Sequence, residues 1–159
     1  MSDKYYYLVA SLPYLEFGKK APIGKEEFLA ECGKWLSEKE LGLLEASNAH
    51  SPEPRAFLAC WREFDNGLRE ALGWFRKNTH GKTIPQILNG VFKQDNPLEK
   101  EIAFERIRWQ FLEDEEATHH FDITKIIIYF LKLRILLRLD TFNKEKGKAA
   151  LKELCAINY

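Results

Sequence analysis

The chain has 159 residues, enough for one domain with its own hydrophobic core. Hydrophobic residues make up 45% and charged residues 30%, a composition typical of a globular protein in water. Lysine plus arginine equals aspartate plus glutamate, at 24 each, which argues against nucleic-acid binding because that function needs a marked basic excess.

The first 24 residues are predicted to form an N-terminal arm and a loop. Residues 5–13, YYYLVASLP, favour a short helix or an extended arm that ends at Pro13. Their aromatic residues would also suit a strand, but no other segment offers a partner strand. Gly18, Pro22 and Gly24 indicate a loop before the helical part of the chain.

Two short helices are predicted between residues 25 and 47. Apolar residues recur at spacings of three and four, which gives one apolar helix face; they are Phe28, Leu29, Cys32, Trp35 and Leu36. The sequence Ser37-Glu38-Lys39-Glu40 matches a capping box, in which the first and last side chains satisfy each other's backbone N–H groups. A second helix should therefore begin at about residue 37.

A long third helix is predicted from residues 51–54, SPEP, to residues 78–81, NTHG. Serine caps a helix, proline fits its first turn, and glycine suits the position after its end. The apolar stripe consists of Phe57, Trp61, Phe64, Leu68, Leu72 and Phe75.

Four more helices are predicted in the rest of the chain. One opens at residues 83–86 and runs to about 93, and the next opens at Asn96-Pro97 and fades over residues 113–116. Asp122 should cap another that runs to about residue 143, and a last helix is expected near residues 146–157. The chain is thus predicted to be all-α: one domain over residues 1–159, with a bundle of about six to seven helices over residues 25–159.

Residues 125–140, KIIIYFLKLRILLRLD, raise the question of a membrane helix. A spanning helix needs about 20 mostly apolar residues, and the longest apolar run here is residues 126–131. At about 100° per residue, Lys125 and Lys132 share one side and Arg134 and Arg138 lie roughly opposite. The pattern predicts a central buried helix with two narrow polar seams rather than a span.

No catalytic, cofactor-binding or metal-binding constellation is predicted. Phosphate-loop and serine-elbow motifs are absent, and the adjacent His119 and His120 point too far apart to chelate one ion. Cys32, Cys60 and Cys155 are expected to be buried, reduced thiols of a cytoplasmic protein.

Three arginines stand out because they sit in strongly apolar helices: Arg69, Arg134 and Arg138. They could be structural and pair with carboxylates such as Glu101, Glu105 or Asp140. They could also form a polar seam that contacts another protein.

Several segments together resemble a family of short uncharacterised bacterial proteins encoded beside the genes of V-type (V/A-type) ATPases. These segments are residues 5–13 (YYYLVASLP), 26–29 (EEFL), 36–37 (LS), 129–138 (YFLKLRILLR) and 142–147 (FNKEKG). That family in turn resembles a reduced form of the C-type rotor component of these ATPases, known as the d-type component in eukaryotes. A faint internal echo, Leu68-Arg69 against Leu133-Arg134, is compatible with the repeated helical unit of that component.

The resemblance implies a non-catalytic, all-helical rotor part. Its expected partners are a D/F-like shaft and the membrane proteolipid ring, and its expected place is the cytoplasm, peripheral to the inner membrane. The chain is about half the length of the full C-type component, so it holds one repeat or two abbreviated ones.

Two other functions stay open. The first is a stand-alone helical adaptor or assembly factor, which should expose a large apolar patch. The second is an enzyme or ligand carrier, which should have a concave site with several convergent polar groups.

Overall fold

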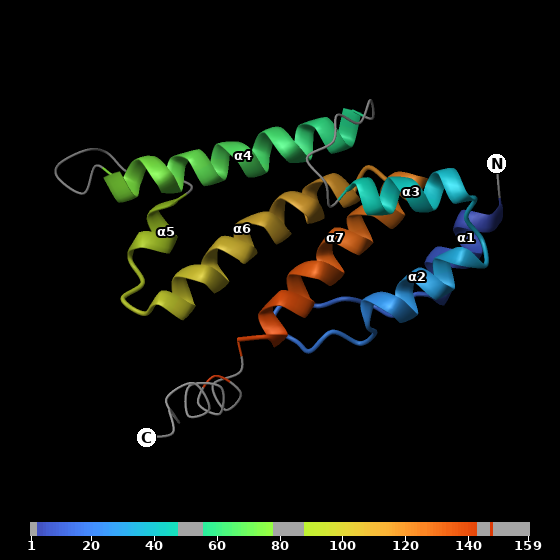
Figure 1. Cartoon of the computed structure of the whole chain (residues 1–159), viewed down its shortest axis with the longest axis horizontal. Helices are drawn as coiled ribbons and strands as arrows, with labels where there is room; N and C mark the ends of the chain where they lie inside the picture. Colours follow the sequence, from blue (N-terminus) through green and yellow to red (C-terminus); the bar gives the residue numbers. More distant parts are fainter. Residues whose placement is uncertain (1–2, 48–55, 78–87, 143–146, 148–159) are drawn as a thin grey trace, which may run out of the picture.

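The computed structural model describes residues 3–47, 56–77, 88–142 and residue 147. These residues form seven helices and no strand, which confirms the predicted all-α, single-domain fold (Figure 1). The helices are α1 (Asp3–Ser11), α2 (Lys25–Gly33), α3 (Glu38–Ala46), α4 (Ala56–Lys77), α5 (Asn89–Phe92), α6 (Pro97–Glu116) and α7 (Ile123–Asp140). None of the helices in these ranges combines the length and the apolar character needed to cross a bilayer.

Helix α7 is the central helix. It buries ten of its 18 residues and packs against α1, α3 and α6 (Figure 1). The ring of Phe28 in α2 stacks on Tyr129 and on Phe130, at centroid distances of 5.5 and 5.3 Å. Burying these apolar and aromatic side chains is the main source of stability, at about 25 cal/mol per Å². The prediction of a buried helix at residues 125–140 is confirmed.

A second, smaller cluster joins α4, α5 and α6. It consists of the buried residues Leu68, Leu88, Val91 and Phe104. In Figure 1, α6 lies between α4 and α7. Stacking of Phe64 on Phe111, at 4.2 Å between ring centroids, fixes α4 against α6. Helix α6 therefore presents one face to each cluster, because its apolar residues are distributed over more than one side of the helix.

The predicted apolar stripe of α4 holds for the residues whose side chains are described. Phe57, Trp61 and Leu68 are buried, and Phe64 and Leu72 are packed at the edges of the two clusters. The helix begins by residue 56, so its predicted cap at residues 51–54 lies outside the described residues, as do the end at 78–81, the opening at 83–86 and the helix at 146–157.

The predicted helix starts that can be checked are correct. Ser37 and Glu40 form the capping box of α3. The side chains of Asn96 and Asp122 accept hydrogen bonds from first-turn N–H groups, at 3.0 and 2.8 Å. One end differs from the predictions, since α7 stops at Asp140 rather than near residue 143, whereas α6 ends at Glu116, within the predicted range of 113–116. The acidic run keeps helical geometry because several of its carboxylates have partners.

The N-terminal segment is a helix, not an extended arm, and a carboxylate from α3 holds it in place. Glu40 accepts hydrogen bonds from Lys4 at 2.7 Å, from the Tyr5 hydroxyl, and from the backbone N–H of Ser37 at 2.8 Å. Burial alone would raise the pKa of Glu40, but these donors outweigh it and lower the pKa to about 2.

We expect Glu40→Gln to lower the free energy of unfolding by about 1–3 kcal/mol, because charged hydrogen bonds are lost. The folded-state pKa lies below the unfolded value of about 4.3, so this stabilisation is present above pH 4.3 and is lost as the pH falls toward 2. Urea unfolding at several pH values measures it. Glu38→Gln, exposed in the first turn of the same helix, is the control and should cost no more than about 0.5 kcal/mol.

One cysteine prediction is wrong. Cys32 is buried as predicted, but Cys60 is exposed. Cys60 lies on α4 about 80° from the centre of the apolar stripe, at the edge where the helix meets solvent. Cys155 lies outside the described residues. Burial, with a smaller contribution from the charge of Glu31, raises the pKa of Cys32 to about 12, so this thiol stays protonated.

A thiol-reactive reagent should therefore modify Cys60 rapidly in the folded protein and leave Cys32 unmodified until the protein unfolds. Peptide mapping by mass spectrometry after short exposure separates the sites. Equal labelling of Cys32 and Cys60 under native conditions would contradict the burial of α2 against α7.

Candidate functional site: an arginine-lined cavity

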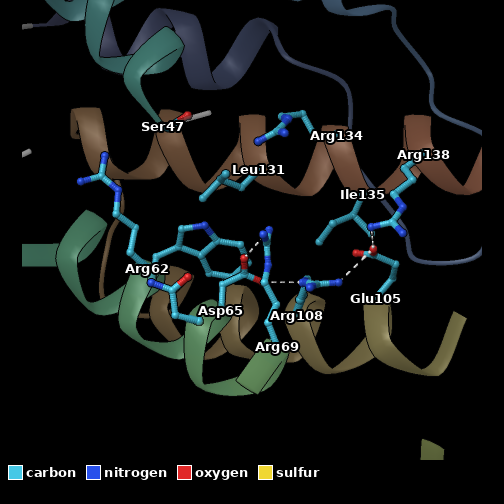
Figure 2. A pocket seen from close by; sticks show the side chains of 12 residues that line it. Ser47, Arg62, Asp65, Arg69, Glu105, Arg108, Leu131, Arg134, Ile135 and Arg138 are labelled. Carbon is cyan, nitrogen blue, oxygen red and sulfur yellow. Dashed lines mark hydrogen bonds and ion pairs between the residues drawn. The ribbon is translucent and has the colours of Figure 1, made fainter. Parts of the chain in front are cut away.

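A cavity of about 220 Å³ opens between α4, α6 and α7 (Figure 2). Its apolar wall is made by Trp61, Leu131 and Ile135. Its polar wall carries five arginines and two carboxylates: Arg62, Arg69, Arg108, Arg134, Arg138, Asp65 and Glu105. We call this site the arginine cavity. It combines a concave shape with convergent polar groups, which is the combination expected of a ligand site.

Arg108 of α6 is the centre of the polar wall. It donates to Asp65 of α4 at 2.7 Å and to Glu105, one turn earlier on α6, at 3.1 Å. All three side chains are largely buried, with exposed fractions of 13%, 14% and 2%. The guanidinium therefore compensates two buried carboxylates and joins α4 to α6.

Arg138 and Arg69 complete the paired part of the wall. Arg138 of α7 donates to Glu105 at 2.7 Å and to Glu101 at 3.0 Å, so its predicted pairing with these two residues is confirmed. Arg69 pairs with Asp65, four residues earlier on α4, at 2.8 Å. Both arginines have a structural partner, whether or not they also contact another protein.

Asp140, the third predicted partner, is not used by these arginines. It accepts a hydrogen bond from the backbone N–H of Ala21 at 3.1 Å. The carboxylate thereby fixes the loop before α2 to the end of α7, a role that its sequence position does not reveal.

Two arginines of the cavity retain unused donors. Arg134 has no hydrogen bond and no ion pair with any described residue, and no dashed line reaches it in Figure 2. Arg62 donates to the Ala46 carbonyl at 3.3 Å, but its buried Nε has no partner in the described part of the chain. Burial lowers the pKa of Arg134, although the charges of Glu105 and Asp65 partly oppose this. The buried Nε of Arg62 is costly while it stays unpaired, whereas Arg134 is exposed and its donors are open to a partner from solvent.

The electrostatic balance of the cavity is positive. Among the residues that the structure describes, five guanidinium groups face two carboxylates there, and Glu101 is one further carboxylate bound to them, through Arg138. Burial, the largest influence, raises the pKa of Glu105 even though Arg108 and Arg138 lower it. The carboxylates inside the cavity thus neutralise fewer than half of its positive charges.

Sequence reasoning found part of this site. It singled out Arg69, Arg134 and Arg138, and the structure brings all three to the cavity. It missed Arg62 and Arg108. The i, i+3 spacing of Glu105 and Arg108 was a usable local signal, but the Asp65–Arg108 pair is separated by 43 residues and has no signature in the sequence.

The second polar seam of α7 lies on its other side. Lys125 and Lys132 both pair with Glu116 of α6, Lys125 at 2.8 Å. The side chain of Lys132 is only 7% exposed and lies 4.9 Å from the Trp109 ring centroid. This pairing explains how a lysine fits in the centre of the most apolar helix.

The histidine-rich turn before α7 has a structural arrangement. His119 lies 2.6 Å from a carboxylate oxygen of Asp122, the cap of α7, and its ring contacts Phe57. His80 lies outside the described residues. In the ranges that the structure describes, no three His, Cys, Asp or Glu side chains are grouped so as to hold a metal ion.

A row of exposed aromatic rings forms a separate feature at the α1 end of the molecule. Trp35 stacks on Tyr7 at 5.6 Å, Tyr7 meets Tyr6 at 5.7 Å, and Tyr6 meets Phe121 at 5.1 Å. Their exposed fractions are 38%, 54%, 53% and 54%. We call these four residues the aromatic surface. Contiguous exposed aromatic side chains are typical of protein interfaces.

The comparisons with known proteins give one result. Residues 79–157 match the model of a family described as "Protein of unknown function (DUF2764)". The match includes α5, α6 and α7, and thus the Glu105, Arg108, Arg134 and Arg138 wall of the cavity, but not α4. No curated protein and no solved structure matches the chain.

Proposed function

We propose that the chain is a non-catalytic component of a V-type (V/A-type) rotary ATPase. Its role would be that of a C/d-type connector between the D/F-like rotor shaft and the membrane proteolipid ring. It would lie peripheral to the inner membrane, on the cytoplasmic side, and take part in ion transport without an active site of its own.

The aromatic surface is the observation that best supports a protein-binding role. Tyr6, Tyr7, Trp35 and Phe121 touch one another in a row and keep a large part of each ring in contact with solvent. Aromatic anchors of this kind dominate the binding free energy of many interfaces. The choice of an ATPase as the partner rests on the sequence resemblance.

The packing of α7 suits a mechanical role. It is buried against α1, α3 and α6, and ion pairs join both of its polar seams to α6. Close-packed helices have low compressibility and transmit strain between their ends. A connector that carries torque needs this property more than it needs a pocket.

Affinity purification of the tagged protein from its native cells in mild detergent, followed by mass spectrometry, tests the proposal. We expect the proteins of the rotor shaft and the ring to co-purify in a fixed ratio. Tyr7→Ala plus Phe121→Ala should reduce their recovery at least about tenfold, because two interface anchors are removed. The matched control is Tyr14→Ala, since Tyr14 is 84% exposed but makes no ring contact with the aromatic surface.

Recovery of the protein without ATPase components, from an extract in which the ATPase is intact, would overturn the proposal. If another protein is recovered in fixed ratio and its recovery depends on Tyr7 and Phe121, the chain is a stand-alone adaptor. The aromatic surface supports that second function equally well, because aromatic composition alone does not specify a partner.

A further inference from the structure

We propose that the arginine cavity is a binding site for a small phosphate-bearing anion. The residues that would hold it are Arg62, Arg69, Arg108, Arg134 and Arg138. This inference does not depend on the proposed ATPase role, since the cavity is formed by α4, α6 and α7, whereas the aromatic surface is formed around α1.

The arrangement of charge is the first argument. Five guanidinium groups from three helices converge on one cavity, and three carboxylates of the described residues pair with them: Asp65, Glu105 and, through Arg138, Glu101. Folding such a set together costs free energy through mutual repulsion and desolvation. A bound anion removes that cost, and this is the usual reason for keeping several arginines around one space.

The free donors are the second argument. Arg134 has no partner among the described residues, and the buried Nε of Arg62 has none either. The exposed guanidinium of Arg134 can be reached by a ligand from solvent, and the buried Nε of Arg62 carries the cost of an unsatisfied donor. Here the paired arginines, Arg69, Arg108 and Arg138, hold the carboxylates in place, while Arg62 and Arg134 keep N–H groups for a ligand.

Size and charge density indicate the ligand class. The cavity volume of about 220 Å³ is below the range of about 300–1,000 Å³ that is usual for drug-sized ligands. A carboxylate supplies one negative charge, whereas a phosphoryl group supplies about two in a similar space and offers three acceptor oxygens. Two linked phosphoryl groups best match the surplus of positive charge and the donors on opposite walls.

The apolar wall limits what else can enter. Leu131 and Ile135 offer no hydrogen bonds to a ligand, and Trp61 offers only its indole N–H, so this wall suits the ester or anhydride part of a phosphate compound. The anion is either free pyrophosphate or the phosphoryl end of a larger molecule whose remainder stays outside. Both sources share the same chemistry inside the cavity.

Isothermal titration calorimetry on the full chain, at fixed physiological ionic strength, tests the inference with pyrophosphate, ADP and citrate. We expect saturable one-to-one binding of pyrophosphate. Arg134→Gln should weaken it about ten- to a hundredfold, the usual effect of losing a charge-assisted hydrogen bond. Arg62→Gln should also weaken it. Lys39→Gln removes an exposed charge of α3 outside the cavity and should change the affinity less than about twofold.

Each outcome bears on the inference. Tighter binding of pyrophosphate than of ADP identifies a free anion, and tighter binding of ADP identifies the phosphoryl end of a larger molecule; both support the site. Absence of saturable binding to either compound, or equal weakening by Arg134→Gln and Lys39→Gln, would overturn it. Citrate binding as tight as pyrophosphate would overturn the assignment to phosphate. Arg134→Gln is a mild probe, because Arg134 is exposed and makes no hydrogen bond or ion pair with a described residue, so its replacement should change the free energy of unfolding little.

Discussion

Glu116→Gln is expected to lower the free energy of unfolding by about 3 kcal/mol, one of the largest effects of a single polar substitution in this chain. Glu116 is the close partner of the buried Lys132 and also binds Lys125 at 2.8 Å. The other carboxylate near Lys132, that of Glu113, is 3.9 Å away and 44% exposed. Removing the charge of Glu116 therefore leaves an ammonium group poorly compensated inside the bundle.

Replacing the other member of the ion pair, Lys132, should lower the free energy of unfolding much less. Lys132→Met is expected to cost less than about 1.5 kcal/mol, because methionine fills a similar volume against Trp109 and Glu116 keeps Lys125 as its partner. Urea denaturation of both variants measures this asymmetry. If Glu116→Gln and Lys132→Met cost the same, the ammonium group is better solvated than its 7% exposure indicates.

The pH dependence gives an independent check of the same pair. Burial by itself would raise the pKa of Glu116, but hydrogen bonds from Lys125 and Lys132 prevail and lower it. A carboxylate with a lowered pKa stabilises the fold above its unfolded pKa of about 4.3 and loses this effect as the pH falls. The stability difference between wild type and Glu116→Gln should therefore shrink on acidification below pH 4.

Arg108→Ala is the second substitution with a large expected effect, about 2–4 kcal/mol. It removes the guanidinium that joins Asp65 of α4 to Glu105 of α6, at 2.7 and 3.1 Å. Asp65 still pairs with Arg69, and Glu105 still pairs with Arg138. The loss of stability is therefore smaller than if both carboxylates were left without any partner. Thermal or urea unfolding measures it, with Arg69→Ala as the matched control. Arg69 is 57% exposed, and its loss should cost no more than about 1 kcal/mol.

Acidification should partly rescue Arg108→Ala. The pKa of Glu105 is already raised, chiefly by burial, and losing Arg108 removes a charge that lowers it. A raised carboxyl pKa means that the folded state binds a proton more readily than the unfolded state. Stability relative to wild type should thus increase as the pH falls from 7 toward the ordinary glutamate pKa of about 4.3. A deficit that is constant from pH 7 to 5 would contradict the burial of Glu105.

Local signals in the sequence were sufficient for most of the fold. Ser37, Asn96 and Asp122 cap helices because a side-chain oxygen next to an apolar repeat satisfies the first N–H groups, and this depends on only a few neighbouring residues. The central position of α7 followed from apolar residues on all sides of it. The two polar seams followed from the angle between Lys132 and Arg134, and both pair with α6 as helical geometry allows.

The arginine cavity required the packing of distant segments. Arg62 and Arg108 look like ordinary surface residues in the sequence, since each lies near acidic residues on an amphipathic helix. Their convergence depends on how α4 crosses α6, and that is set by Phe64 and Phe111, which stack although they are distant in sequence. Cys60 was mispredicted for a related reason, because its exposure depends on what packs beside α4 and not on its own neighbours.

The similar sequences Leu68-Arg69 and Leu133-Arg134 occupy corresponding places in the structure. Both leucines are buried, and both arginines line the same cavity from different helices. An apolar residue followed by an arginine places one side chain in the core and the next about 100° away, toward the rim. Such a pair on each of two facing helices is one way to build a shared basic site.

The connector role is tested most directly by ATP-driven ion uptake in membrane vesicles from cells that lack this protein. We expect ATP hydrolysis by the soluble ATPase sector to persist while ion uptake is lost, since shaft and ring are no longer joined. Uptake should return with the wild-type protein and with Tyr14→Ala, but not with Tyr7→Ala plus Phe121→Ala. Normal ATP-driven ion uptake in vesicles without the protein would contradict the connector role.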